Sequence, residues 1–218
     1  GGVIWIVTFG TQTVTVISKF PYIRAIGHGG KLSAVLPGIR PRAIGQAVAQ
    51  MVRDGDTLFL NSGTTCEIVA AQLSIRRNLN IVTNSLNVAV RLGTVPTFRV
   101  LLVGGEINAH YGFTHGGDAQ EQLSKYQADW AVLAVDGISA QGGVTTHHAE
   151  EAVIDRMMAA GAKQRVIVAD STKIGKAGFS RVCECSGLLT LVTNPGGDAE
   201  ALTQLEETGV SIHFGTEV

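Results

Sequence analysis

A turn that combines glycine with hydroxyl residues could bind an anion in this chain. The turn Ser62–Thr65 follows the apolar run 57–60 and opens a predicted helix at 65–74. Backbone N–H groups and hydroxyls converge in such a turn, and the positive end of the helix dipole adds to them, so the spot suits a phosphate or carboxylate. The alternative is that Ser62 or Thr64 only caps the helix. The helix spacing gives one shared apolar face, formed by Cys66, Val69, Ala70 and Leu73.

The same order of apolar run and small polar turn recurs four more times. The turns follow runs that end near residues 82, 103, 135 and 169. In an open α/β sheet, ligands bind outside the carboxyl ends of the strands, where all these turns would gather. The candidate ligand-binding residues are Ser62, Gly63, Thr64, Thr65, Thr83, Asn84, Ser85, Gly104, Gly105, Asp136, Gly137 and Lys173.

Three of these residues have distinct expected roles. Gly63 lets the backbone approach a ligand closely. Lys173 neutralises a phosphate or bonds a ligand hydroxyl, unless it is simply solvated. Asp136 stands where an apolar run meets Gly137, and 138–140 contains no further acid, so we expect it to bind ligand hydroxyls rather than to act as a catalytic base.

We expect no metal and no cofactor. His147 and His148 are adjacent in a predicted helix and point in different directions, so they do not form a metal pair. The three cysteines are an odd number and lack a ligand cluster at metal spacing. We interpret them as free thiols in a reducing cytoplasm.

From residue 57 onward, predicted strands and helices alternate. Several strands are continuous apolar runs, as expected when both faces of a sheet are covered. The pattern predicts an α/β fold, with a largely parallel, Rossmann-like sheet and helices on both faces. Asp118 and Asp198 stand where helix N-caps belong, and Ala43, Ala47 and Met51 could line the inner face of the first helix. The predicted strands are 57–60, 80–83, 98–103, 130–135, 165–169, 189–193 and 210–214, and the predicted helices are 40–53, 65–74, 85–92, 118–126, 148–160 and 198–207.

The first 42 residues form an N-terminal segment and linker, and residues 43–218 form the ligand-binding domain. The β-prone runs 3–7 and 13–17 predict a hairpin, and the glycines at 27–30 predict a flexible joint.

Composition limits the partners of the chain. Its 218 residues are 45% hydrophobic and 16% charged, with a formal net charge of −1 and no dense basic stretch. These residues are therefore not expected to grip DNA phosphates by themselves. The apolar run 3–9 is too short to span a bilayer, so we expect no membrane partner.

The motifs from Asp54 onward resemble the C-terminal effector-sensing domain of DeoR-family bacterial transcriptional regulators. The resemblance covers about 160 of the 218 residues. It implies a fold shared with ribose-5-phosphate isomerase and glucosamine-6-phosphate deaminase. It also implies a phosphorylated sugar, or a breakdown product of one, as the effector of a regulator that is most often a repressor. The matching motifs lie at 54–57, 62–65, 82–85, 104–105, 126–129, 136–138 and 169–173.

The resemblance weakens near the N-terminus. Family members carry a winged helix-turn-helix ahead of a His-Gly-Gly junction, whereas here 27 residues precede His28 and show no two-helix pattern. Operator DNA is therefore a partner of the parent protein, through a winged helix-turn-helix that is not visible in this chain. A regulator that reads paired half-sites needs symmetry, so we expect a homodimer or homotetramer.

Two other functions compete with an effector-binding domain. The first is a sugar-phosphate isomerase or deaminase on the same fold, and the missing acids after Asp136 argue against it. The second is a CoA-transferase-like or kinase-like α/β domain, but the chain lacks a Walker-type loop and a suitably placed catalytic glutamate. We therefore expect a sensor and not an enzyme.

Overall fold

The structure is a computed structural model that describes residues 3–9, 12–18 and 39–215. The chain divides into two units, Gly1–Ala34 and Val35–Val218. In the first unit, strands β1 (Val3–Phe9) and β2 (Gln12–Ser18) pair antiparallel, which confirms the predicted hairpin. The joint predicted at 27–30 lies outside the described residues. The division of the chain at residue 42 stays a prediction.

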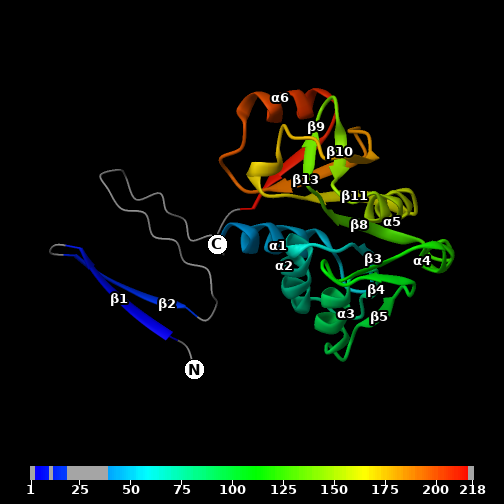
Figure 1. The fold of residues 1–218 in the computed structure, drawn as a ribbon, viewed down its shortest axis with the longest axis horizontal. Helices are drawn as coiled ribbons and strands as arrows, with labels where there is room; N and C mark the ends of the chain where they lie inside the picture. The colour runs from blue at the N-terminus through cyan, green and yellow to red at the C-terminus, as the bar shows by residue number, and fades with distance from the viewer. Residues whose placement is uncertain (1–2, 10–11, 19–38, 216–218) are drawn as a thin grey trace. The chain divides into compact units, whose positions relative to one another are not determined.

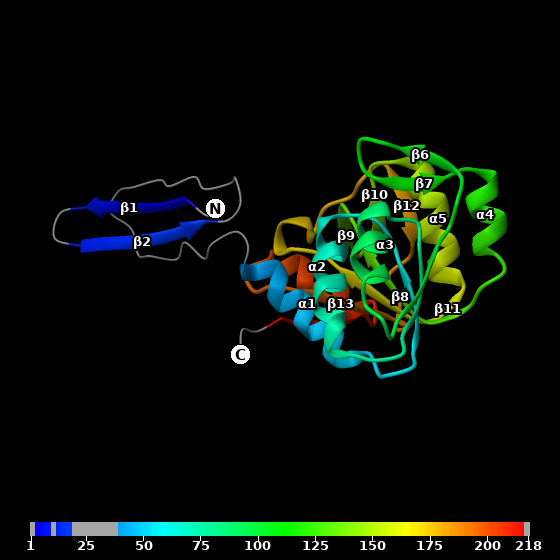
Figure 2. The ribbon, with the colours of Figure 1, turned by 90° about the horizontal axis from the view of Figure 1, so that it is seen from below.

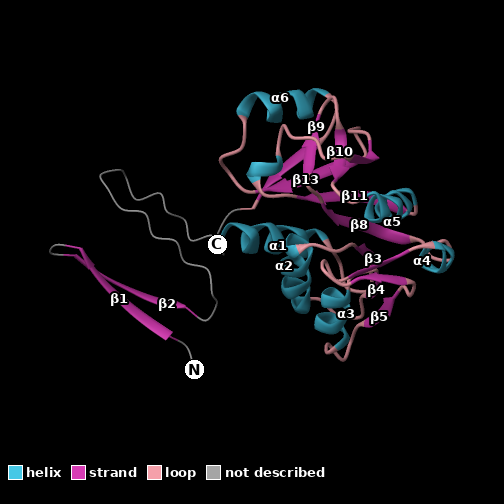
Figure 3. Ribbon diagram, in the orientation of Figure 1, coloured by secondary structure: helices cyan, strands magenta, loops and turns pink. Residues whose placement is uncertain are grey.

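The second unit is built on a seven-stranded sheet whose neighbouring strands are all parallel (Figure 3). The strand order is β14-β13-β11-β8-β3-β4-β5. Each predicted strand is present within three residues of its predicted bounds. The strands are β3 (Thr57–Leu60), β4 (Asn80–Thr83), β5 (Arg99–Leu102), β8 (Ala128–Ala134), β11 (Ala162–Val168), β13 (Leu189–Thr193) and β14 (Ser211–Phe214).

Helices cover both faces of this sheet, as the sequence predicts (Figure 1). Alternate strand residues face opposite layers, so Leu58 and Leu60 join one core while Phe59 joins the other. One face is covered by α1 (Ile39–Met51), α2 (Thr64–Gln72) and α3 (Leu86–Gly93). The other face is covered by α4 (Gly117–Leu123), α5 (Ala149–Ala160) and α6 (Ala199–Glu207).

The predicted inner faces of the helices are largely correct. Cys66, Val69, Ala70 and Leu73 are all fully buried, as their spacing predicts. In α1, Ala43 is buried, but Ile44 and Val48 contribute more to the core than the half-buried Ala47 and Met51. None of the helices in the described ranges is long and apolar enough to cross a bilayer.

Short antiparallel strands that the sequence analysis missed lie beside the carboxyl ends of the parallel strands. β6 (Glu106–Asn108) and β7 (Phe113–His115) form a hairpin. A three-stranded sheet in the order β12-β10-β9 comprises β9 (Gly137–Ser139), β10 (Gly143–Thr146) and β12 (Ser180–Cys183). Two short 3-10 turns, at Leu73–Ile75 and Ser171–Lys173, complete the described elements.

The helix caps test the sequence punctuation. Asp198 is the N-cap of α6, and its Oδ1 accepts hydrogen bonds from the N–H groups of Glu200 (3.0 Å) and Ala201 (3.2 Å). The prediction for Asp118 is wrong, because α4 begins at Gly117 and Gly116, two residues before Asp118, is its N-cap. Asp118 lies in the first turn, where its charge still favours the helix dipole.

The residue that follows the last strand of the second unit packs against its first helix. Gly215, just after β14, donates its N–H to the carbonyl oxygen of Thr193 at 2.8 Å and is buried against the start of α1. A Cβ on Gly215 would lie 2.6 Å from the carbonyl carbon of Ala43.

Candidate functional site

The candidate site lies at the carboxyl ends of β3 and β8, where the strand order reverses. From β3 the chain adds β4 and β5 on one side, whereas β8, β11, β13 and β14 continue on the other. In open α/β sheets, ligands bind at such a switch point. We call this edge the rim, and it comprises Ser62–Thr65, Asp136, Thr146, Glu151 and Lys173.

Asn61 ties the two halves of the sheet together beneath the rim. Its side chain accepts the N–H of Ala134 at 2.8 Å and donates to the Ala134 carbonyl at 2.9 Å, so it bridges β3 and β8. Its Nδ2 also lies 3.1 Å from Oδ1 of Asp155 on α5. Asn61 is fully buried, and it therefore fixes the floor of the site.

The N-terminus of α2 opens onto the rim without a side-chain cap. Gly63 is the N-cap residue, with φ +112°, and no side chain accepts a hydrogen bond there. The capping role weighed for Ser62 or Thr64 is therefore wrong. Gly63 and Thr64 are exposed, and the first N–H groups of a helix have no partner within the helix. A non-glycine residue would be strained at this φ and would bring its Cβ to 3.2 Å from that of Ala134.

A chain of hydroxyls and carboxyls joins the α2 turn to Asp136. The Ser62 hydroxyl donates to Oε1 of Glu151. The other oxygen of Glu151 lies 2.9 Å from the Thr146 hydroxyl, which lies 3.1 Å from Oδ2 of Asp136. Because a hydroxyl has one proton to donate, Thr146 bonds both carboxyls at once only when one of the two is protonated and donates to it.

The electrostatics favour Glu151 over Asp136 as the carboxyl that holds a proton. Burial raises the pKa of Glu151 by more than the hydrogen bonds from Ser62 and Thr146 lower it. Burial also raises the pKa of Asp136, but the N–H of His147 and the charge of Lys173 together outweigh burial, so that pKa lies below its ordinary value. The His147 N–H lies 3.0 Å from Oδ2 of Asp136.

Lys173 contributes the positive charge of the rim. Its Nζ lies 3.3 Å from Oδ1 of Asp136, and both side chains are about a third exposed, at 33% and 28%. Asp170 accepts the N–H of Thr172 at 2.8 Å and caps the turn that presents Lys173. Lys173 is thus held near Asp136 while its charge stays accessible to a ligand.

The predicted residues at the end of β4 form hydrogen bonds inside the protein. Thr83 accepts the N–H of Ser85 at 3.0 Å, and Ser85 caps α3 by accepting the N–H of Val88 at 3.3 Å. Asn84 donates to the carbonyl of Thr114 at 3.2 Å, and its own Oδ1 has no partner in the described part of the chain. All three are buried, so their part in ligand binding stays a prediction.

The remaining predicted glycines have packing reasons for being glycine. A Cβ on Gly105, which has φ +134°, would lie 2.3 Å from the carbonyl oxygen of His115, and one on Gly137 would lie 2.5 Å from that of Lys176. Gly104 donates its N–H to Oε1 of Gln122 at 2.9 Å. A ligand role for these positions stays a prediction.

The sequence analysis missed two acids that α5 contributes to the site. Glu151 is 9% exposed and Asp155 is fully buried. The expectation that no further acid accompanies Asp136 is therefore wrong in space, because Glu151 lies one hydroxyl away. Their spacing of one helical turn on the apolar face of α5 was the available signal.

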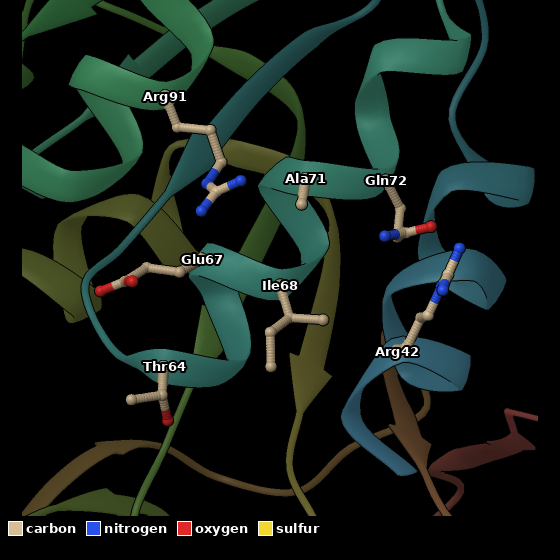
Figure 4. Close-up of a pocket in the computed structure, with 7 residues that line it drawn as sticks. All are labelled: Arg42, Thr64, Glu67, Ile68, Ala71, Gln72 and Arg91. Carbon is tan, nitrogen blue, oxygen red and sulfur yellow. The ribbon is translucent and has the colours of Figure 1, made fainter. Parts of the chain in front are cut away.

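A groove of about 440 Å³ lies beside the rim, along α2 between α1 and α3 (Figure 4). Thr64 belongs to both the groove and the rim. The other lining residues are Arg42, Glu67, Ile68, Ala71, Gln72 and Arg91. Glu67 accepts a hydrogen bond from Asn87 at 2.7 Å, which links α2 to α3.

The described residues show no metal centre and no reactive thiol. No group of three His, Cys, Asp or Glu side chains among them could hold a metal ion. Cys66, Cys183 and Cys185 are free. Burial raises the pKa of the Cys185 thiol to about 11 and raises that of Cys66 further, so both are protonated near neutral pH.

Comparisons with known proteins show which family this chain resembles. Residues 40–195 match the model of the DeoR C terminal sensor domain. The chain is 31% identical over 185 residues to the HTH-type transcriptional repressor GlcR of Bacillus subtilis, an alignment that covers 85% of this chain and 70% of that protein. It is 25% identical to a putative aga operon transcriptional repressor of Escherichia coli O157:H7, with 94% of this chain and 83% of that protein covered.

Another relative and a solved structure cover less. The glycerol-3-phosphate regulon repressor of Escherichia coli is 34% identical over 61% of this chain and 53% of its own length. A ribose 5-phosphate isomerase from Methanocaldococcus jannaschii aligns with a TM-score of 0.45 and 12% identity, over 61% of this chain and 52% of that chain.

The α/β sheet with a rim at its switch point, matched along most of its length by the sensor model, defines the effector domain of a transcriptional regulator. The chain belongs to the DeoR family.

Proposed function

We propose that this chain is the effector-binding part of a repressor of sugar metabolism, and that its effector is a phosphorylated sugar or a related metabolite. The phosphate binds the turn Ser62–Thr65, and the sugar hydroxyls bind Asp136 and Lys173. Differential affinity for two states of the protein then shifts the arrangement of the DNA-binding parts of the regulator. The relatives support this, since they are named as repressors and one regulates a glycerol-3-phosphate regulon.

The observation that carries the proposal is the uncapped N-terminus of α2. No side chain caps this helix end, and Gly63 and Thr64 are exposed there. Such a helix end favours an anion through hydrogen bonds and through the helix dipole. Lys173, in the turn after β11, adds a positive charge two strands away from β3, where it is held by Asp136.

Alanine substitutions at Thr64 and Thr65 test the phosphate site. Neither side chain caps α2, so the free energy of unfolding should change little. Affinity for a phosphorylated sugar should fall about tenfold or more, because hydrogen bonds to charged groups contribute about 1.5–3 kcal/mol, whereas affinity for the dephosphorylated sugar should not. The measurement is a calorimetric titration of each variant with ribose 5-phosphate and glucosamine 6-phosphate, and with the dephosphorylated form of each sugar.

Two further variants make this test specific. Lys173→Ala should show the same selectivity if Lys173 pairs with the phosphate, and equal losses for both ligands if it holds a hydroxyl. Thr203→Ala, on the exposed face of α6, is the matched control and should change neither affinity. Equal losses for both ligands in every rim variant would contradict the phosphate site.

The position of Glu151 also gives the enzyme alternative a concrete test. Glu151 supplies the additional carboxyl that the sequence did not reveal, but both its oxygens are hydrogen-bonded, to Ser62 and Thr146. Because neither oxygen is free to take a proton from a substrate, we expect no turnover of ribose 5-phosphate or glucosamine 6-phosphate. Turnover well above the uncatalysed rate that Glu151→Gln abolishes would establish the isomerase or deaminase function instead.

A further inference from the structure

Two aromatic side chains meet above the rim, and no role has yet been given to them. Tyr111, in the loop of the β6–β7 hairpin, contacts His148 with ring centroids 4.3 Å apart. Tyr111 is 52% exposed, although it also contacts His110 at 4.6 Å. A large ring that is ordered by neighbours but half open to solvent is a surface available to a ligand.

The sheet order places this pair over the end of β3. The Tyr111 side is anchored at the end of β4, where the Leu86 N–H bonds the carbonyl of Gly112 at 2.9 Å and the Thr114 N–H bonds that of Asn84 at 2.8 Å. The His148 side belongs to the start of α5, next to Thr146 and so to the end of β8. β3 lies between β4 and β8, so the Tyr111–His148 contact spans the strand end that carries Gly63 and Thr64.

The two supports of the pair are fixed independently of a ligand. Tyr111 is held by its own N–H, which bonds Oδ1 of Asn108 at 3.3 Å. His148 is the N-cap residue of α5, yet its side chain makes no capping hydrogen bond, so its ring is free to face Tyr111. Figure 2 shows the β6–β7 hairpin beside the same end of α5.

We propose that Tyr111 and His148 form an aromatic wall against which the carbon face of the effector's sugar packs. This rests on the proposed function, because it places the sugar between the wall and the phosphate turn at Ser62–Thr65. The C–H face of a sugar is apolar and can cover an aromatic ring, while its hydroxyls remain directed to Asp136 and Lys173. The wall selects for a sugar and is indifferent to the phosphate.

The test separates the ring from the rest of the hairpin. Tyr111→Ala should weaken ribose 5-phosphate or glucosamine 6-phosphate about three- to tenfold, while inorganic phosphate binds as in wild type. Tyr111→Phe keeps the ring and should bind within about twofold of wild type. Tyr126→Ala removes an exposed tyrosine just before the amino end of β8, at the opposite end of that strand from the rim. This variant should change the affinity for neither ligand. Calorimetric titration measures the affinities, and a melting curve confirms that each variant is folded.

Failure of the wall and failure of the phosphate site give different results. If Tyr111→Ala binds phosphosugars as tightly as wild type, or loses sugar and inorganic phosphate equally, the wall is overturned while the phosphate site stands. The opposite case, in which the phosphate site fails and the wall stands, is tested by NMR of the Tyr111 ring signals as sugars are added. If dephosphorylated sugars shift the Tyr111 signals as strongly as phosphosugars do, the wall stands and the phosphate site fails. If no sugar in either form shifts those signals, the wall is overturned.

Discussion

Asp155 is a fully buried ionisable residue beside the rim. Its carboxyl is fully buried, Oδ1 accepts from Asn61 at 3.1 Å, and Oδ2 has no partner among the described residues. Burial raises its pKa well above the ordinary value, and Glu151 raises it further whenever Glu151 is ionised. A protonated Asp155 is therefore the form that the folded protein prefers.

This preference predicts how stability depends on pH. Because the folded pKa of Asp155 is raised, its contribution to the free energy of unfolding is complete below its ordinary pKa of about 3.9 and is lost as the pH rises through the folded value. Asp155→Asn cannot ionise, so wild type should lose stability relative to this variant as the pH increases from about 4. Urea denaturation between pH 5 and 8 measures the difference, and a difference that does not change with pH would refute the assignment.

Residue-scale chemistry was only partly predictable from the sequence. The glycine and hydroxyl pattern at 62–65 identified the start of α2, since turn chemistry is local, but it left open whether a side chain caps the helix. Glu151 and Asp155 were not identified, because a charged residue on a helix is usually solvated and only the fold shows that α5 turns both inward. The hydroxyls of Ser62 and Thr146 that satisfy Glu151 come from segments 89 and five residues away.

At the scale of elements, the β6–β7 hairpin depends on one glycine. Gly105 has φ +134°, and a Cβ there would lie 2.3 Å from the carbonyl oxygen of His115. Gly105→Ala should lower the free energy of unfolding by about 1–3 kcal/mol, because it adds strain and a backbone clash. Gly93→Ala is the matched control at the end of α3, where no heavy atom lies within 4 Å. It should be neutral or raise stability by up to about 1 kcal/mol. Equal effects of the two substitutions in chemical denaturation would contradict this account.

The long elements were predictable, and the short ones were not. Strands such as β8 and β11 contain continuous apolar runs, because they are buried on both faces. β6 contains Glu106, Ile107 and Asn108 with no buried residue, so it carries no alternation to detect. Its pairing comes from tertiary contacts with β7.

At the scale of the whole molecule, charge predicts how this chain behaves toward nucleic acid. It contains 17 basic and 18 acidic residues, with a net charge of −1. Few counterions would be released by such a chain, so residues 1–218 should not bind duplex DNA tightly. Fluorescence anisotropy with an operator-like duplex at two salt concentrations is the measurement. Nanomolar affinity that falls steeply with salt would show that these residues contain the DNA-binding surface.

The close approach of Gly215 to Ala43 allows the chain of the second unit to be circularly permuted. Gly215, just after the last strand, lies against Ala43, four residues after the start of α1, so a short peptide could join that strand to the first helix. New termini could then be opened at Gly196, which is exposed and has open space around it. Such a circular permutant should keep the parallel sheet and the rim, since every contact that defines them is independent of chain order. The first helix and the last strand of this unit therefore lie close enough to be connected in a new order.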